Sequence, residues 1–247
     1  MFDEFTKKKA VFLSYKPFSK DFMSIYDDLN CLDFAYMNLK LDGSSMTREG
    51  VNQIMRGGVI DDIPLMEHQE IECHRLLLRT FSDMAEMDME LDETQLKRLY
   101  KVLTGKDDAQ LRRSAITLYH LDYVPPKPHE IEEALRGIFM EVFKTDFQGD
   151  FIRKAVFIHN KIIEVYPFKN KNEALARTAM EYELIRNDMP VVAYKLTEPQ
   201  YNSILSEYLK TGDYDPLLEN ILHSAVIKLD SLIKMIRVSK AHNSGCG

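Results

Sequence analysis

The residues whose types and spacing suggest chemistry lie in one stretch, EVYPFKNKNEALARTAM, which covers residues 164–180. An apolar, helix-forming run ends in Tyr166-Pro-Phe, a short polar loop follows, and a second helical run begins at Ala174. This is the shape of an active-site loop, but a tyrosine has a pKa of about 10 and is a poor base at pH 7. Lys169 and Lys171 offer positive charge to an anion, or serve only to keep an exposed loop soluble.

Two nearby polar residues have simpler interpretations. Asn172 precedes the second helix, and its side-chain oxygen is expected to cap that helix, which is a common role for Asn. His159 lies seven residues before Tyr166, or about 10 Å along a helix at 1.5 Å per residue. It is too distant to act as a base at the loop, and we expect a packed histidine.

Helical periodicity dominates the remainder of the chain, because apolar residues recur at steps of three and four. The pair Gly57-Gly58 and Gly105 are expected to end two of these helices. Residues 111–123 instead alternate in character, which predicts extended chain in a short hairpin. The predicted fold class is all-α with one small β flap, and a frayed tail is expected over residues 239–247. The predicted helices are 20–40, a short one from 47, a long one after 64, one around 96–103, and 131–143, 151–165, 174–187, 198–209 and 216–236.

Composition narrows the class of protein. The chain has 247 residues, 45% hydrophobic and 29% charged, which suits one large globular domain or one domain with a small helical extension. The net charge of -7 and the lack of a basic stripe argue against a nucleic-acid surface.

The same sequence offers no export or membrane signal. No stretch approaches the ~18 apolar residues of a membrane helix, and the opening MFDEFTKKKAVFL does not have the pattern of a signal peptide. Cys31, Cys73 and Cys246 show neither metal-ligand spacing nor a disulfide framework. We therefore expect a cytoplasmic protein with buried or incidental thiols and no metal bound by cysteines.

Four longer stretches carry a resemblance to a known family. They are LDGSSMTREGVNQIMRGGVIDDIPLMEHQEI, QLRRSAITLYHLDYVPPKPHEI, FIHNKIIEVYPF and YNSILSEYLKTGDYDPLLENIL. In this order they resemble the inhibitory-helix region, the flap, the helix before the active loop and the segment after the core of the Fic (Fido-fold, Fic/Doc) family. The resemblance implies an all-α Fic-type domain with a short β-hairpin flap. It divides the chain into N-terminal helices with an inhibitory-helix-like region (1–90), a core with flap and loop (91–212), and a C-terminal helix with a frayed tail (213–247).

The loop of the family has the pattern H-x-F-x-[D/E]-G-N-G-R-x-x-R, and this sequence keeps the scaffold positions. Pro167, Phe168 and Asn172 match the family, and Arg177 matches the second Arg. The resemblance implies that Asn172 and Arg177, with Lys171 beside them, contact a nucleotide or phosphate. Structural pairing within the helix bundle is the favoured alternative for Arg177, because the first Arg of the pattern is absent.

The chemical positions of the pattern differ. Tyr166 stands where the family has its catalytic His, and Asn170 stands where an acidic residue holds the metal. Lys171 and Glu173 replace the two glycines, and Ala174 replaces the first Arg. A neutral Asn carbonyl is a weaker Mg²⁺ ligand than a carboxylate. Lysine and glutamate also bring side chains into the space where glycine N–H groups would close around phosphates.

The family reaction, as the resemblance implies it, moves AMP from ATP to a protein hydroxyl with Mg²⁺ present and the His as general base. Since most chemical positions differ, we expect little or no such activity, and a chain retained for binding a protein partner or for regulation. The alternative is an active transferase in which Lys169, Lys171 and Arg177 hold a different phosphorylated donor.

The inhibitory motif of the family, [S/T]-x-x-x-E-[G/N], places its Glu against the second Arg of the loop. The aligned positions here hold Asn38, Asp42 and Gly43. The resemblance implies a contact between Asp42 and Arg177 as a relic of regulation, provided that the shorter acid reaches. Two alternatives stay open: Asp42 only begins the turn before Gly43, or SMTREG at residues 45–50 is the motif, displaced by seven residues.

The flap, residues 112–123, is the part of the chain where a partner is expected. In the family a flap aligns the target segment by strand addition, and the β-forming residues here keep that potential. An ordinary edge hairpin is the equal alternative. No nucleic-acid or membrane partner is expected.

Overall fold

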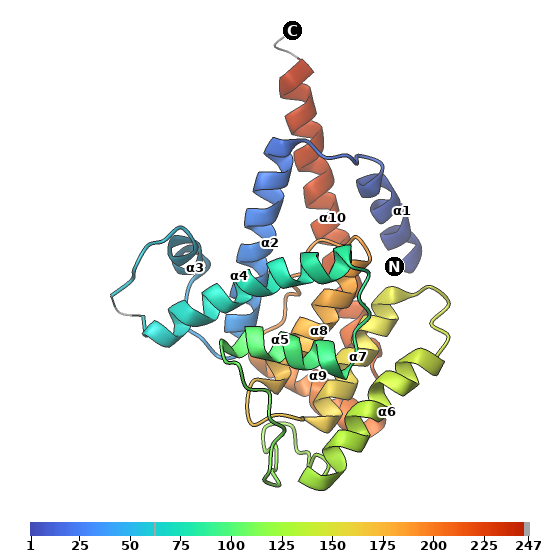
Figure 1. Cartoon of the computed structure of the whole chain (residues 1–247). Coiled ribbons are helices and arrows are strands. Elements are labelled where there is room, and N and C mark those ends of the chain that lie inside the picture. Colours follow the sequence, from blue (N-terminus) through green and yellow to red (C-terminus); the bar gives the residue numbers. More distant parts are fainter. Residues whose placement is uncertain (62, 245–247) are drawn as a thin grey trace.

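The computed structural model describes residues 1–61 and 63–244, with side chains through Ser239. The described residues form ten α-helices and one short 3₁₀ helix (Figure 1), so the all-α fold class predicted from the sequence is confirmed. The helices are α1 Phe2–Leu13, α2 Lys20–Leu41, α3 Arg48–Met55, α4 Leu65–Glu86, α5 Glu93–Thr104, α6 Ile131–Lys144, α7 Phe151–Val165, α8 Asn172–Arg186, α9 Glu198–Thr211 and α10 Asp215–Ser244, with the 3₁₀ helix Pro128–Glu130 before α6.

Local sequence sets where many of these helices begin. Ser19, Thr47, Asp92, Asp150 and Thr197 precede α2, α3, α5, α7 and α9, and each side chain accepts a hydrogen bond from a backbone N–H of the first turn. Such caps satisfy N–H groups that have no partner inside the helix, and each stabilises a helix by about 1 kcal/mol.

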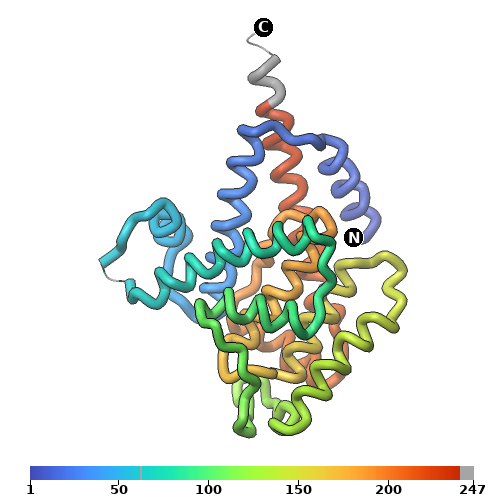
Figure 2. The backbone as a smooth tube through the Cα atoms, in the orientation of Figure 1, coloured from blue at the N-terminus to red at the C-terminus, as the bar shows by residue number. Residues whose placement is uncertain are grey.

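Helix α8 lies at the centre of the fold, and Figure 2 shows the other helices around it. Almost every residue from Asn172 to Leu184 is buried, which is expected of a helix with packing partners on all sides. Helix α7 lies along it, and α4 and α5 pack on it as well. The loop between α7 and α8 is therefore held by the best-packed part of the molecule.

The two ends of the chain differ from the prediction. The sequence pattern assigned no helix to Phe2–Leu13, yet α1 forms and packs against α10, with Phe5 and Phe12 buried. Helix α10 continues through Ser244, where a frayed tail was expected from Ser239. Residues 245–247, including Cys246, lie outside the described part of the chain.

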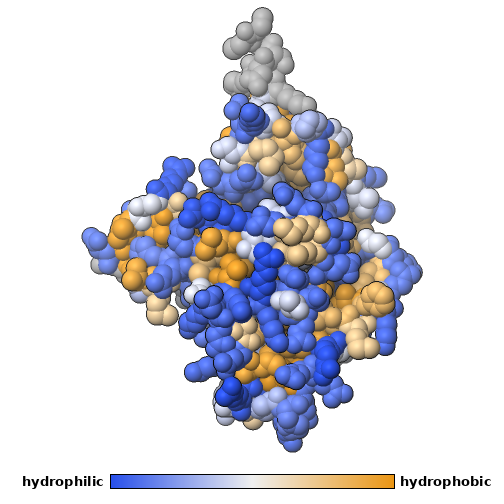
Figure 3. Space-filling view, in the orientation of Figure 1, coloured by the Kyte–Doolittle hydropathy of each residue, from blue (hydrophilic) through white to orange (hydrophobic). Residues whose placement is uncertain are grey.

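A second, smaller core joins α2, α3 and α4 beside the main one. It is built from Leu32, Ala35, Leu39, Met46, Val51, Ile54 and Ile71. Figure 3 shows apolar surface gathered over the lobe made by α3 and the start of α4, where Val59, Leu65 and Met66 are exposed. No helix among the described residues is long and apolar enough to cross a membrane.

Candidate functional site

The loop between α7 and α8 has the helix–loop–helix form that the sequence predicted. Tyr166 follows the last residue of α7 and adopts a left-handed backbone, with φ 46°. Lys171 is also left-handed, with φ 56°, and α8 begins at Asn172. Two non-glycine residues in this conformation carry a steric penalty that the surrounding contacts must offset.

Asn172 does not cap α8, so that prediction is wrong. Lys171 occupies the capping position, and Asn172 is already the first residue of the helix. Its buried side chain turns back to the loop, where its Oδ1 accepts from the N–H of Phe168 at 2.8 Å and its Nδ2 donates to the carbonyl of Phe168 at 2.9 Å. Asn172 thus fixes the shape of the loop.

A stacked aromatic pair holds the loop from the side of α5. Phe168 is fully buried, and its ring lies on that of Tyr100 with 3.9 Å between centroids and 10° between planes. The Tyr100 hydroxyl donates to Oδ1 of Asn170 at 2.8 Å. The one side-chain oxygen at the family metal position is therefore already an acceptor within the protein.

The flap is joined to the loop through Arg112, a residue that the sequence did not single out. The backbone N–H of Arg112 donates to the carbonyl of Pro167 at 2.9 Å, next to an antiparallel bridge between Leu111 and Phe168. Its buried guanidinium donates to the carbonyl of Tyr166 at 2.8 Å, to that of Ser114 in the flap and to that of Pro126 just after it. Several backbone carbonyls converge at this position, and the guanidinium of an arginine has enough N–H groups to donate to all of them.

The flap itself is closed by one antiparallel bridge, between Leu118 and Tyr123. Its tip contacts the loop: Nε2 of His120 lies 2.7 Å from Oε1 of Glu173, and the Tyr166 hydroxyl donates to the same oxygen at 3.2 Å. Burial raises the pKa of Tyr166, and the negative charge of Glu173 raises it further. The tyrosine therefore stays protonated at neutral pH and acts as a hydrogen-bond donor.

Arg177 is completely buried, and its polar contacts come from α2. Its Nε donates to Oδ1 of Asn38 at 2.8 Å, and its Nη2 donates to Oδ1 of Asp42. The guanidinium also lies 5.4 Å from the ring centroid of Tyr201. These are the contacts of an arginine paired within a helix bundle, and the shorter acid does reach.

Asp42 also ends α2 and precedes Gly43, whose φ is 85°, so the residue both turns the chain and pairs with Arg177. Burial alone raises the pKa of Asp42, but the positive charges of Arg177 and Lys171 outweigh it and hold the pKa below its ordinary value. The competing motif at residues 45–50 provides Glu49, which is exposed in the first turn of α3 and makes no ion pair within the described residues.

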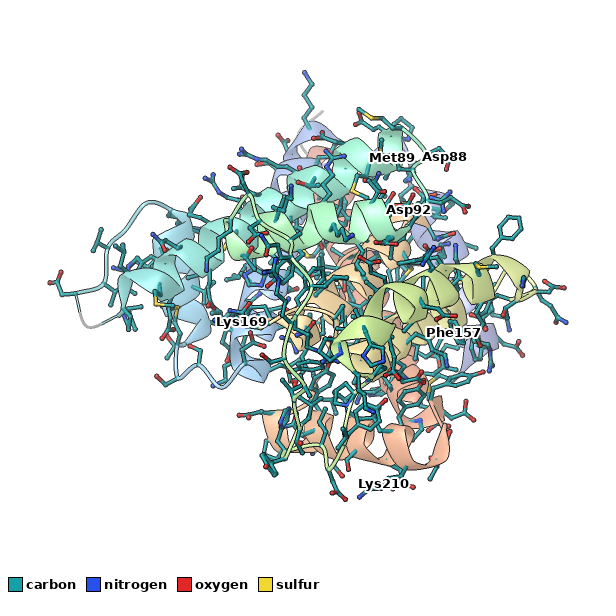
Figure 4. The ribbon with its side chains drawn as sticks, turned by 60° about the horizontal axis from the view of Figure 1, so that its bottom comes forward. Asp88, Met89, Asp92, Phe157, Lys169 and Lys210 are labelled. Atoms are coloured by element: carbon teal, nitrogen blue, oxygen red, sulfur yellow. The ribbon has the colours of Figure 1, made fainter. Side chains whose placement is uncertain are left out.

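Lys171 extends the same network to α4. Its Nζ lies 3.0 Å from Oδ2 of Asp42 and 2.8 Å from Oε1 of Glu70. The side chain that replaces a glycine in the family pattern thus links the loop to both α2 and α4. Lys169, by contrast, is exposed and lies beside the flap (Figure 4).

His159 is buried and packed, as expected. Its Nδ1 lies 2.7 Å from Oδ1 of Asn160, and its Nε2 lies 2.7 Å from the Tyr201 hydroxyl. Burial lowers the pKa of His159 to about 3, against the opposing effect of Asn160. The imidazole is therefore neutral and positions Tyr201 beside Arg177.

The residues present do not fit a magnesium-bound nucleotide. Asn170 is neutral and already accepts a hydrogen bond, and Ala174 leaves the loop without a second arginine. Arg177 is directed to α2, while Glu173 adds a negative charge where phosphates would lie. In the part of the chain described, no three or more His, Cys, Asp or Glu residues come together as a metal site.

Comparison with known proteins agrees with this architecture. Residues 90–184 match the model of the Fic/DOC family. The chain is 22% identical over 222 residues to "Protein adenylyltransferase fic-1" of Caenorhabditis elegans. The matched region covers 86% of this chain but only 43% of that protein.

Solved structures are similar in fold. A Fic domain containing signaling protein from Bacteroides thetaiotaomicron superposes with a TM-score of 0.81 at 16% identity, covering 95% of this chain and 98% of that one. Fic-1 of C. elegans (residues 134–508) gives a TM-score of 0.76 at 16% identity, covering 96% and 72%.

Proposed function

Because the chain belongs to the Fic/DOC family, we propose that it is a Fic-fold protein with little or no adenylyl-transfer activity, retained for binding a protein partner or for regulation. The relative named as an adenylyltransferase is more than twice as long as the part this chain matches. Adenylyl transfer, the activity named for that relative, is the activity that we propose this chain has lost or keeps only weakly.

The observation that carries the proposal is the burial of Arg177. This arginine is the charged phosphate-binding position of the family pattern that the sequence keeps, and it has no exposed surface. Asn38 and Asp42 accept from its Nε and Nη2, so a phosphate that took these two donors would have to displace both partners at the end of α2. A phosphate would therefore have to compete with Asp42 for a guanidinium that is already paired and buried.

The remaining loop residues support the same proposal. A general base must be deprotonated near pH 7 to accept a proton, and the raised pKa of Tyr166 opposes this. Lys171 fills space that glycine would leave open, and its ammonium is paired with Asp42 and Glu70.

The alternative of a transferase with another phosphorylated donor has weaker support. Of the three cations that it requires, Lys171 and Arg177 are already paired with carboxylates. Lys169 remains exposed, and one flexible surface lysine is a poor anion site because water screens its charge.

A protein partner at the flap agrees with the exposure of its backbone. Ala115, Ile116 and Thr117 make no backbone hydrogen bond among the described residues, so an extended peptide finds free N–H and C=O groups there. Tyr119 at the tip is 88% exposed. A cytoplasmic location, where protein targets and ATP are both present, is part of this proposal.

Incubation with ATP labelled at its α-phosphate and Mg²⁺ tests the proposal. The purified chain should label neither itself nor proteins of a cell lysate above background. The control is Tyr166→Phe, which removes only the hydroxyl. Clear labelling by the natural chain that disappears in Tyr166→Phe would overturn the proposal, because the tyrosine would then take part in transfer.

A further inference from the structure

A cavity of about 510 Å³ lies away from the loop, where α2, α3 and α4 meet the end of α8. Figure 1 shows α3 set to one side of α2, and α4 crossing α2. The three helices pack on one another through the smaller core, which gives the cavity fixed walls. Ligand sites for small molecules have volumes of about 300–1,000 Å³ and are largely preformed.

One side of the cavity is basic. Arg56 comes from the end of α3, and Arg75 and Arg79 come from α4. Arg75 is paired with Glu72 on its own helix. The guanidinium groups of Arg56 and Arg79 make no hydrogen bond or ion pair within the part of the chain that the structure describes. Both side chains are exposed, but unlike a single surface cation they line one cavity together, and two guanidinium groups without acidic partners are suited to bind an anionic group.

Among the described residues, the carboxylates that line the cavity itself are Asp27 and Asp28 of α2. Burial raises the pKa of Asp27, and the charge of Asp28 acts in the same direction. An anionic group is therefore repelled from α2 and directed toward α3 and α4.

The floor and inner wall are apolar. Leu78 from α4, Ile185 from the end of α8, and Met189 and Val191 from the segment that follows α8 line them, and Tyr26 adds an aromatic face. Such a surface accommodates a hydrocarbon or aromatic body, and methionine adapts to different shapes. The lining thus combines a cationic side with an apolar wall.

We propose that this cavity binds a small amphipathic anion, namely a carboxylate or phosphate attached to an aromatic or aliphatic body. The site is separate from the Fic loop. It lies beside Asn30 and Cys31 of α2, and Asp42 is 11 residues further along the helix, or about 16 Å at 1.5 Å per residue. The inference does not depend on whether the loop is active.

The test is a titration of the ¹⁵N-labelled full chain with 2-naphthoate, followed by NMR. Saturable shifts are expected at amides that line the cavity, such as Asn30, Asn52 and Val191. 2-Naphthyl phosphate should compete for the same amides, whereas 2-naphthylmethanol, which has the same body without charge, should bind at least tenfold more weakly.

Variants distinguish this site from general adhesion to the surface. The double change Arg56→Gln and Arg79→Gln should weaken binding of 2-naphthoate at least tenfold, and Ser82→Trp should block the cavity with its charges intact. The matched control, Arg113→Gln with Arg136→Gln, removes two arginines elsewhere and should leave binding unchanged. Absence of saturable shifts at the cavity, or equal losses in both double variants, would overturn the proposal.

Discussion

Asp42 and Arg177 are 135 residues apart in the sequence, and their contact closes the candidate site. The arginine has no exposed surface, while 22% of the Asp42 side chain is exposed. An uncompensated guanidinium inside the core is far more costly than an unpaired aspartate at a helix end. Removal of the carboxylate therefore measures the cost of leaving this buried guanidinium without a charged partner.

Asp42→Ala should lower the free energy of unfolding by about 3 kcal/mol, at the low end of the range for a broken buried pair because water reaches this carboxylate. The matched control is Glu49→Ala, which removes the carboxylate of the competing motif and should change stability by less than about 0.5 kcal/mol. Urea unfolding at pH 7 measures both. Equal effects of the two changes would contradict the assignment of Asp42.

The same pair predicts a pH dependence. The folded pKa of Asp42 is lowered, so its contribution is complete above the unfolded value of about 3.9 and is lost as the pH falls through the folded pKa. The difference in stability between the natural chain and Asp42→Asn should therefore be constant from pH 5 to 7 and shrink below pH 4. A difference that grows on acidification would contradict the ion pair.

The dependence of stability on pH that we expect from Glu181 has the opposite sign. Burial raises its pKa to about 8, although the N–H of Val192 and the charge of Lys228 act against this. The folded chain then holds a proton that the unfolded chain releases above about pH 4.3, so stability falls as the pH rises toward 8. Glu181→Gln keeps the acceptor for Val192 and should remove a slope of roughly 1 kcal/mol per pH unit. If the free energy of unfolding changed with pH in the same way in the natural chain and in Glu181→Gln from pH 5 to 8, Glu181 would be charged in the folded chain.

At the scale of elements, the flap and the loop are held together by few contacts. Arg112 joins their bases, and His120 with Glu173 joins the flap tip to the first turn of α8. The Glu173 side chain is 17% exposed and that of His120 is 44% exposed. Half-buried contacts of this kind hold a segment in place more firmly than fully solvated ion pairs do.

His120→Ala should loosen the flap. Hydrogen exchange at the amides of Leu118 and Tyr123 should become faster, because local opening of the hairpin would cost less free energy. The control is Lys210→Ala, which removes an exposed ion pair with Asp122 on the same flap and should change exchange little. If both variants loosen the flap equally, the contact with Glu173 is not what holds it.

The sequence predicted the elements better than the contacts. Periodicity located α2 and α7 within a residue or two, because each has a broad apolar face. Helix α1 was missed, since its two buried phenylalanines lie seven residues apart, with charged residues between them, and become buried only by packing against α10.

The candidate site was predictable as a set of positions but not as a network. The loop residues were all located, and Asp42 was assigned to Arg177 only through the family resemblance. The pairing of Lys171 with Glu70, and of His120 with Glu173, joins residues from different helices and from the flap. No local pattern encodes such pairs, because they arise from how the helices pack. Asn172 was assigned to the wrong role for a simpler reason: the helix begins one residue earlier than a cap would require.

At the scale of the whole molecule, the closed site connects three helices. Lys171 and Arg177 bring the loop and α8 against α2 through Asp42, and Lys171 reaches α4 through Glu70. The C-terminal end of α2 contacts Arg177, and the N-terminal half of the same helix lines the cavity. We propose that this arrangement leaves no place for a nucleotide with its metal.

Calorimetric titration with ATP and Mg²⁺ tests that claim most directly. The comparison is a variant in which the loop is rebuilt and released, combining Tyr166→His, Asn170→Asp, Lys171→Gly, Glu173→Gly, Ala174→Arg and Asp42→Ala. The natural chain should give no saturable heat at millimolar nucleotide, whereas the rebuilt chain should show binding that requires Mg²⁺. Magnesium-dependent binding by the natural chain, at an affinity similar to that of the rebuilt one, would contradict the account.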